Sequence, residues 1–120
     1  MKRILVVDDK PASARVVKLG LERVGYEVEL ARDGAEALEQ LDKNEYRALV
    51  TDICMPRTDG RALVEQVSAR GPSDLFIVVM TSRPEDEFRE WAESMERVCF
   101  LEKPVSLRRL VSRLESILGE

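Results

Sequence analysis

Short runs of apolar residues recur along the chain and are separated by longer segments of mixed polarity. The runs at 4–8, 48–52, 75–80 and 98–101 are continuous rather than alternating, which is typical of strands buried on both faces of a parallel sheet. The run at 26–31 alternates between apolar and polar residues, which favours a strand nearer the edge with one polar face. The pattern therefore predicts five strands.

The segments that follow these runs show helical spacing. Pro11 and Pro84 suit the first turns of helices. A helix that buries Val17, Leu21 and Val24 on one face is predicted by their steps of three and four. The spacing is clearest near the C-terminus, where one apolar face consists of Leu107, Leu110, Val111, Leu114, Ile117 and Leu118.

Polar residues that favour helix N-termini support these boundaries. Asp33 with Glu36 and Ser82 with Glu85 have the spacing of a capping box. Ser106 stands where its hydroxyl can cap the last helix.

Strand and helix thus alternate five times. A right-handed crossover at each step gives a doubly wound α/β fold, in which one parallel sheet carries helices on both faces. We expect a single domain over residues 1–120, because the chain has the length of one domain and no linker or repeat interrupts the pattern. In such sheets the ligand site lies beyond the carboxyl ends of the strands.

Charge and composition narrow the possible partners. The chain has 23 acidic and 19 basic residues, a formal net charge of −4, which argues against direct nucleic acid binding. No apolar stretch approaches the roughly 20 residues that cross a bilayer, and the start lacks a signal peptide, so we expect a cytoplasmic protein without membrane contact. With no histidine and two distant cysteines, any chemistry falls to carboxylates, hydroxyls and lysines.

Polar residues gather where the predicted strands end. Asp8 and Asp9 end the first strand, Asp52 the third and Thr81 the fourth, and Lys103 follows the fifth. Three crowded carboxylates repel one another unless a cation is present, and oxygen ligands of this kind suit Mg²⁺ (magnesium). A metal, a lysine and a hydroxyl around an aspartate are sufficient for phosphoryl transfer, which mainly needs positioning and charge neutralisation.

One of the three aspartates is expected to act as the nucleophile. Asp8 and Asp9 are neighbours and suit a pair of metal ligands, whereas Asp52 stands alone after a buried strand. An aspartate can form an acyl phosphate as a covalent product. We therefore predict Asp52 as the phosphoryl acceptor.

These residues, in this order, resemble the receiver domain of bacterial two-component response regulators, of the kind found in chemotaxis regulators. The resemblance covers roughly residues 2–118. It implies a flavodoxin-like (βα)5 fold with strand order 2-1-3-4-5. The motifs that carry it are Val-Val-Asp8-Asp9, Thr-Asp52-Ile-Cys-Met-Pro56 with Asp59-Gly60, Val-Met-Thr81-Ser82 and Phe100-Leu-Glu-Lys103-Pro104.

The resemblance implies a role for each matching residue around the acceptor. Asp52 takes a phosphoryl group from a phosphohistidine of a sensor histidine kinase or phosphotransfer protein. Asp8 and Asp9 hold Mg²⁺ together with the Asp52 carboxylate and the backbone carbonyl of Cys54. Lys103 pairs with the phosphoryl group. Such a domain catalyses only its own phosphorylation and dephosphorylation.

The resemblance also implies a switch. Thr81 moves toward the phosphoryl group and Phe100 follows it inward, which shifts a pre-existing equilibrium between two states. The face formed by the fourth helix, fifth strand and fifth helix then recruits an output partner, a fused effector domain or a second copy in a homodimer.

Some positions depart from the usual family pattern. Cys54 and Arg83, two residues beyond the acceptor and the switch threonine, stand where side chains tune hydrolysis of the acyl phosphate. Residues 96–98 replace the glycine and small residues that often precede the last strand. Phe100 in place of a tyrosine removes a phenolic hydrogen bond from the output face.

Other functions fit the sequence less well. An aspartate-dependent phosphatase of the haloacid dehalogenase type needs a second aspartate two residues after the nucleophile. In this chain the residue two positions after Asp52 is Cys54. A toprim-like nuclease needs a glutamate and an Asp-x-Asp pair. A receiver-like scaffold that works without phosphorylation usually lacks an acidic or lysine position, and here all five are present.

Overall fold

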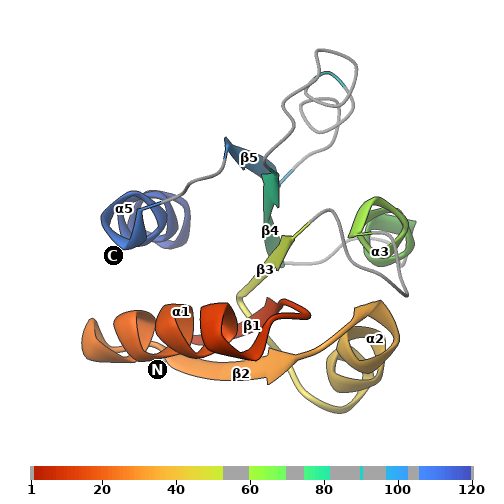
Figure 1. The fold of residues 1–120 in the computed structure, drawn as a ribbon. Coiled ribbons are helices and arrows are strands. Elements are labelled where there is room, and N and C mark those ends of the chain that lie inside the picture. The colour runs from red at the N-terminus through yellow and green to blue at the C-terminus, as the bar shows by residue number, and fades with distance from the viewer. Residues whose placement is uncertain are drawn as a thin grey trace.

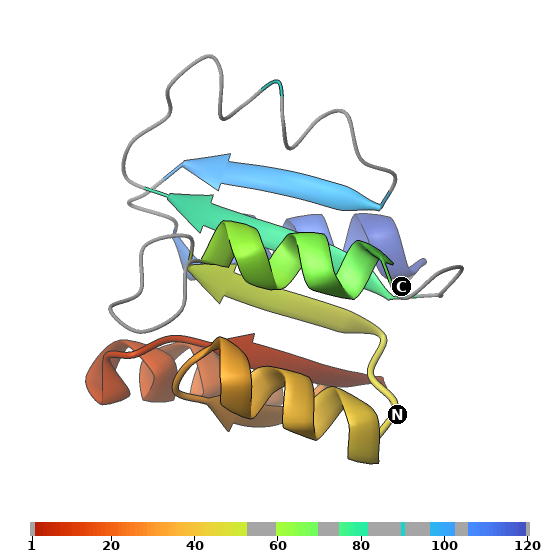
Figure 2. The same cartoon turned by 90° about the vertical axis from the view of Figure 1, so that its right-hand side faces the viewer.

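The computed structural model describes residues 2–52, 60–69, 75–81, 90, 97–102 and 106–119. Its strands form one parallel sheet with the order β2-β1-β3-β4-β5, and in Figure 2 all the arrows point the same way. The strands are β1 (Arg3–Val7), β2 (Glu27–Ala31), β3 (Ala48–Asp52), β4 (Phe76–Thr81) and β5 (Val98–Glu102). The predicted fold class and strand order are confirmed.

Helices cover both faces of this sheet (Figure 1). On one face lie α1 (Pro11–Arg23) and α5 (Leu107–Leu118), and on the other lie α2 (Gly34–Lys43) and α3 (Gly60–Ala69). The helix expected between β4 and β5, with its Ser82 and Glu85 cap, falls outside the described residues. No helix in the described parts of the chain has the length and apolarity needed to cross a membrane.

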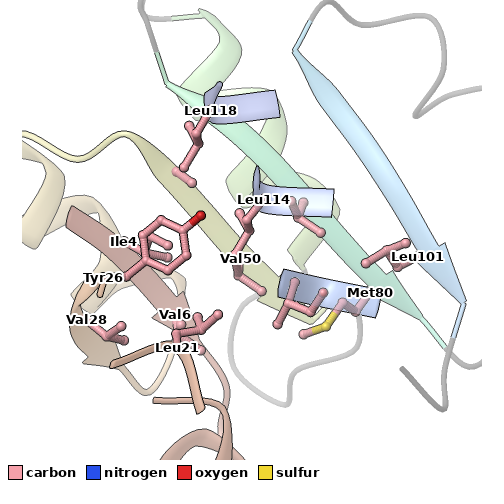
Figure 3. Close-up of a cluster of buried hydrophobic side chains, with 13 residues drawn as sticks. Ile4, Val6, Leu21, Tyr26, Val28, Val50, Met80, Leu101, Leu114 and Leu118 are labelled. Carbon is pink, nitrogen blue, oxygen red and sulfur yellow. The ribbon is translucent and has the colours of Figure 1, made fainter. Parts of the chain in front are cut away.

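Side chains of the strands contribute to two hydrophobic cores because they alternate between the two faces of the sheet. In β1, Ile4 and Val6 face α1 and α5, whereas Leu5 and Val7 join the core beneath α2 and α3. Figure 3 shows the first of these cores, with Leu114 of α5 among the strand side chains. This double burial explains the continuous apolar runs in the sequence.

The strand with the alternating pattern lies at an edge of the sheet. β2 pairs only with β1 among the described strands, and Glu27 on it is exposed. Arg3 of β1 covers this polar edge, with its Nη2 3.3 Å from Oε1 of Glu27 and its Nε 3.7 Å from Oε1 of Glu29. The predicted edge position is confirmed.

The predicted helix starts are found in the described helices. Pro11 opens α1, and Oδ1 of Asp33 accepts a hydrogen bond of 2.9 Å from the backbone N–H of Glu36 at the start of α2. Ser106 caps α5, where its Oγ accepts from the backbone N–H of Arg109 at 3.1 Å. The Glu36 carboxylate binds Arg32, with Nε 3.2 Å from Oε2.

Two expected core positions differ from the prediction. Val24 lies past the end of α1, as its C-cap, and its side chain is 48% exposed. Here the helix ends because Gly25 adopts a φ of 101°, a conformation that glycine reaches without steric cost. Leu107 is 36% exposed and packs against Gly20 of α1.

The sequence at residues 96–98, which differs from the usual family pattern, coincides with an unusual backbone conformation at Arg97. Arg97 has a φ of 64°, the only positive value of a non-glycine residue in the described parts of the chain. This conformation costs roughly 1–2 kcal/mol for a residue with a Cβ. Its carbonyl accepts a 2.7 Å hydrogen bond from Ile77, and its guanidinium lies 5.4 Å from the ring centre of Phe76. These contacts offset the strain at the start of β5.

Candidate functional site

Asp8 directly follows β1 and is held there by backbone contacts. Its N–H donates a 3.0 Å hydrogen bond to the carbonyl of Ala31 at the end of β2. Its carboxylate Oδ1 accepts a 2.9 Å hydrogen bond from the backbone N–H of Lys10. The residue is only 7% exposed. The turn into α1 therefore orients this carboxylate at the carboxyl edge of the sheet.

Asp52 ends β3 at the same edge. It pairs in register with Met80 of β4 and is 5% exposed. The buried hydroxyl of Thr51 donates a 3.0 Å hydrogen bond to the carbonyl of Asp52, which restrains the last peptide unit of the strand. The end of β3 therefore places this carboxylate at the same buried edge of the sheet as Asp8.

The carboxylates of Asp8, Asp9 and Asp52 meet, as predicted. One oxygen from each lies within 4.8 Å of the others. Oδ1 of Asp9 is buried and accepts no hydrogen bond from the described residues. An unpartnered buried carboxylate oxygen beside two further carboxylates is an arrangement that a cation would complete.

These donors fit a hard divalent ion. Mg²⁺ takes oxygen ligands and is usually held by one or two protein carboxylates, with waters and a phosphate oxygen completing its shell. The three aspartates supply only oxygen donors, and none of the described residues adds a histidine or thiol to the cluster. The acidic cluster is therefore typical of a magnesium site rather than of a zinc site.

Both predicted switch residues, Thr81 and Phe100, lie in described strands. Thr81 is the last residue of β4 and pairs with Glu102, so its backbone reaches the edge where Asp52 ends β3. Phe100 pairs with Val79 inside β5 and is half-buried. The side chain of Thr81 lies outside the described structure, and so do Cys54, Arg83 and Lys103 entirely.

Two supporting contacts were not predicted from the sequence. The Lys10 contact uses a backbone N–H, which every residue except proline supplies, so no sequence signal marks it. The Thr51 contact places a fully buried hydroxyl beside the acceptor candidate. The sequence did offer a signal for the Thr51 contact, because Thr51 is a polar residue within an otherwise apolar run.

Fold and site together define a class: a doubly wound α/β domain with a cluster of acidic residues at the carboxyl ends of its strands, of a kind that suits a cation. Residues 4–115 match the response regulator receiver domain family. The chain therefore belongs to this family, and it is a receiver domain of two-component signalling.

Curated relatives agree with this assignment. The chain is 40% identical over 118 residues to the response regulator MprA of Mycobacterium ulcerans (strain Agy99). It is 39% identical over 118 residues to MprA of Mycobacterium leprae (strain TN). Each match covers 97% of this chain and 50% of the relative, so the chain spans about half the length of these relatives.

Solved structures show the same fold. A CheY-like receiver domain protein from Methanospirillum hungatei JF-1 aligns with a TM-score of 0.91 at 28% identity, covering 99% of this chain and 94% of that one. The chemotaxis regulator CheY4 of Vibrio cholerae aligns with a TM-score of 0.85 at 29% identity, covering 98% of both chains.

Proposed function

We propose that this receiver domain is a phosphorylation switch in which the Asp52 carboxylate accepts a phosphoryl group from a phosphohistidine. The observation that carries the proposal is the meeting of Asp8, Asp9 and Asp52 within 4.8 Å at one edge of the sheet. An aspartyl-phosphate switch needs an acceptor carboxylate beside a metal, and this cluster offers carboxylates for both roles.

In the proposed step, an oxygen of Asp52 attacks the phosphorus atom of the donor. The new bond joins this oxygen to phosphorus while the phosphorus–nitrogen bond of the phosphohistidine breaks. Its electron pair goes to the imidazole nitrogen of the donor. The product is an acyl phosphate on Asp52, and its later hydrolysis by water returns the free carboxylate and inorganic phosphate.

The other residues of the pocket prepare this step. In this proposal Asp8 and Asp9 would hold Mg²⁺ together with Asp52 and the carbonyl of Cys54. When bound, the ion neutralises charge on the phosphoryl oxygens. Lys103 is proposed to pair with the phosphoryl group, and the side chains of Cys54 and Arg83 to set the rate of hydrolysis.

The output is proposed to follow from a change at Thr81. Its hydroxyl gains a charged acceptor only in the phosphorylated state, so phosphorylation favours the conformation in which Thr81 and Phe100 have moved inward. The face of the fourth helix, β5 and α5 then changes its affinity for an output partner, a fused effector domain or a second receiver. A sensor histidine kinase or phosphotransfer protein supplies the phosphoryl group.

Mass spectrometry of the intact chain tests this proposal. After incubation with acetyl phosphate and Mg²⁺, the wild type is expected to carry one phosphate, and chelation of the metal should prevent its addition. Asp52→Asn keeps the size of the side chain but removes the nucleophile, so it should gain none. Asp42→Asn, an exposed aspartate of α2, serves as the matched control and should be labelled like the wild type.

Two results would contradict the assignment. An unlabelled wild type would favour a scaffold that works without phosphorylation. A phosphate that remains on Asp52→Asn would place the acceptor elsewhere.

A further inference from the structure

Thr51 is a polar residue inside an apolar layer of the sheet. Apart from two tyrosines, the buried polar or charged residues in the described parts of the chain are Asp8, Asp52 and Thr51. The two aspartates belong to the acidic cluster, whereas Thr51 directly precedes Asp52 and offers no ligand to that cluster. The chemistry proposed for the aspartates therefore does not account for this buried hydroxyl.

Packing alone would be satisfied by a valine at this position. Thr51 pairs in register with Val7 of β1 and Val79 of β4, and both valines are fully buried. Leu49, two residues earlier in β3 and on the same face, belongs to the core beneath α2 and α3. Valine has nearly the shape of threonine and would be buried there without desolvating a hydroxyl group. Packing therefore does not explain why residue 51 carries a hydroxyl.

The hydroxyl of Thr51 holds the backbone of the next residue. It donates a 3.0 Å hydrogen bond to the carbonyl of Asp52, and this contact satisfies the buried donor. Side chains alternate along a strand, so the Thr51 hydroxyl and the Asp52 carboxylate leave β3 on opposite faces of the sheet. The hydroxyl therefore acts on the peptide unit of Asp52 and does not contact its carboxylate.

Strand pairing reaches Asp52 from one side only among the described strands. The register between β1 and β3 ends with Val7 and Thr51, whereas Asp52 pairs with Met80 of β4. A strand end that has lost one neighbour opens more easily than the centre of a sheet. The hydrogen bond from Thr51 thus adds a restraint at the point where pairing with β1 has ended.

We propose that Thr51 is a positioning residue for phosphoryl transfer, because its hydroxyl fixes the peptide unit of Asp52 and thereby the direction of the acceptor carboxylate. The orientation of the Asp52 carbonyl depends on the backbone angles of that residue, and these angles decide which side-chain rotamers are allowed. This inference rests on the proposed function, in which Asp52 is the phosphoryl acceptor. It adds a determinant of the transfer rate that acts through the backbone.

Thr51→Val tests the proposal because it removes the hydrogen bond and nearly keeps the shape of the side chain. Labelling by acetyl phosphate at saturating Mg²⁺ is expected to slow on the order of tenfold, since small misplacements of a reacting group have large effects on rate. The substitution leaves no cavity, so the chain should remain folded under the assay conditions, which denaturant unfolding verifies. A wild-type labelling rate in Thr51→Val would overturn the inference.

Thr51→Ser is the matched variant, because it keeps the hydroxyl and loses only the methyl group. The cavity left by the methyl group should lower the free energy of unfolding, whereas the labelling rate should stay at the wild-type level. Val64→Ala, which shortens a buried valine of α3 in the same core, should behave in the same way. A merely structural role of Thr51 would instead slow labelling in all variants according to their loss of stability, and that result would overturn the proposal.

The carbonyl carbon of Asp52 reports on the hydrogen bond independently of labelling. Its ¹³C nuclear magnetic resonance signal should move upfield in Thr51→Val, because a hydrogen bond polarises the carbonyl, and should stay in place in Thr51→Ser. An unmoved signal in Thr51→Val would overturn the inference even if labelling slowed. Failure of the proposed function would look different, because the wild type itself would then remain unlabelled.

Discussion

At the scale of single residues, the pocket concentrates negative charge where water is scarce. Asp8 and Asp52 are 7% and 5% exposed, and Asp9 contributes a buried oxygen without a partner among the described residues. In general, two unit charges about 4 Å apart repel by about 1 kcal/mol in water and more in a protein. We therefore expect the cluster to lower the stability of the metal-free domain and to raise the gain from binding a cation.

Asp9→Asn separates these two effects. Removing one charge should raise the free energy of unfolding without metal by about 1 kcal/mol, from relief of repulsion. The same change should weaken Mg²⁺ binding by about tenfold or more, since even partners of metal ligands contribute that much. Denaturant unfolding with and without Mg²⁺ measures both effects.

Glu22→Gln is the control for that experiment, because it removes an exposed acid of α1 away from the cluster. It should leave the response to Mg²⁺ unchanged. A metal-free Asp9→Asn that is less stable than the wild type would show that repulsion among the carboxylates does not limit the stability of the metal-free domain.

At the scale of elements, α1, α2 and α5 differ in how their N-termini are capped. α1 starts with a proline and has no side-chain cap, α2 is capped by Asp33, and α5 is capped by Ser106. At its other end, Lys2 donates to the carbonyl of Leu118, which satisfies one of the last carbonyls of α5. α5 is thus held at both ends.

Ser106→Ala is expected to destabilise the domain by about 1 kcal/mol, because the backbone N–H of Arg109 loses its acceptor. Ser112→Ala makes the same substitution at an exposed position inside α5, where alanine is a better helix former. It should be neutral or slightly stabilising. Thermal unfolding of both variants checks the difference, and equal losses would exclude the cap as the cause.

At the scale of the whole molecule, one buried tyrosine links elements that are far apart in sequence. Tyr46 precedes β3, and its hydroxyl lies 3.0 Å from Oε1 of both Glu29 in β2 and Gln40 in α2. The Arg3 guanidinium lies 6.0 Å from its ring centre. Burial, followed by the hydrogen bond and charge of Glu29, raises the pKa of Tyr46 to about 12.

This shift predicts a loss of stability in alkali. The phenol ionises near pH 10 in the unfolded chain but only near its raised pKa of about 12 in the fold. The stabilisation is complete below pH 10 and is lost as the pH rises through 12, with a slope of at most about 1.4 kcal/mol per pH unit. Tyr46→Phe cannot ionise, so its free energy of unfolding should fall less steeply over this range. Parallel curves for the two proteins would contradict the prediction.

The apolar pattern was sufficient to predict the sheet, its edge strand and the described helices. It was sufficient because a side chain buried on either face of a strand must be apolar wherever the neighbouring elements lie. It was not sufficient at Val24, where the helical spacing continued but the backbone had already turned at Gly25. Periodicity records which face is apolar and does not record where a helix ends.

The candidate site was likewise predictable from the sequence only in part. The sequence by itself determined that Asp8, Asp9 and Asp52 lie at the ends of buried parallel strands, since strand direction places those ends at one edge. It also supplied the assignments of Lys103, Thr81, Phe100, Cys54 and Arg83, which remain predictions.

Only the tertiary structure decided how closely the carboxylates meet, that an oxygen of Asp9 is buried without a partner among the described residues, and that Leu107 packs against Gly20. Those features depend on distances between elements far apart in the chain. Such distances follow from the packing of whole helices against the sheet, and a local pattern of residues does not encode them.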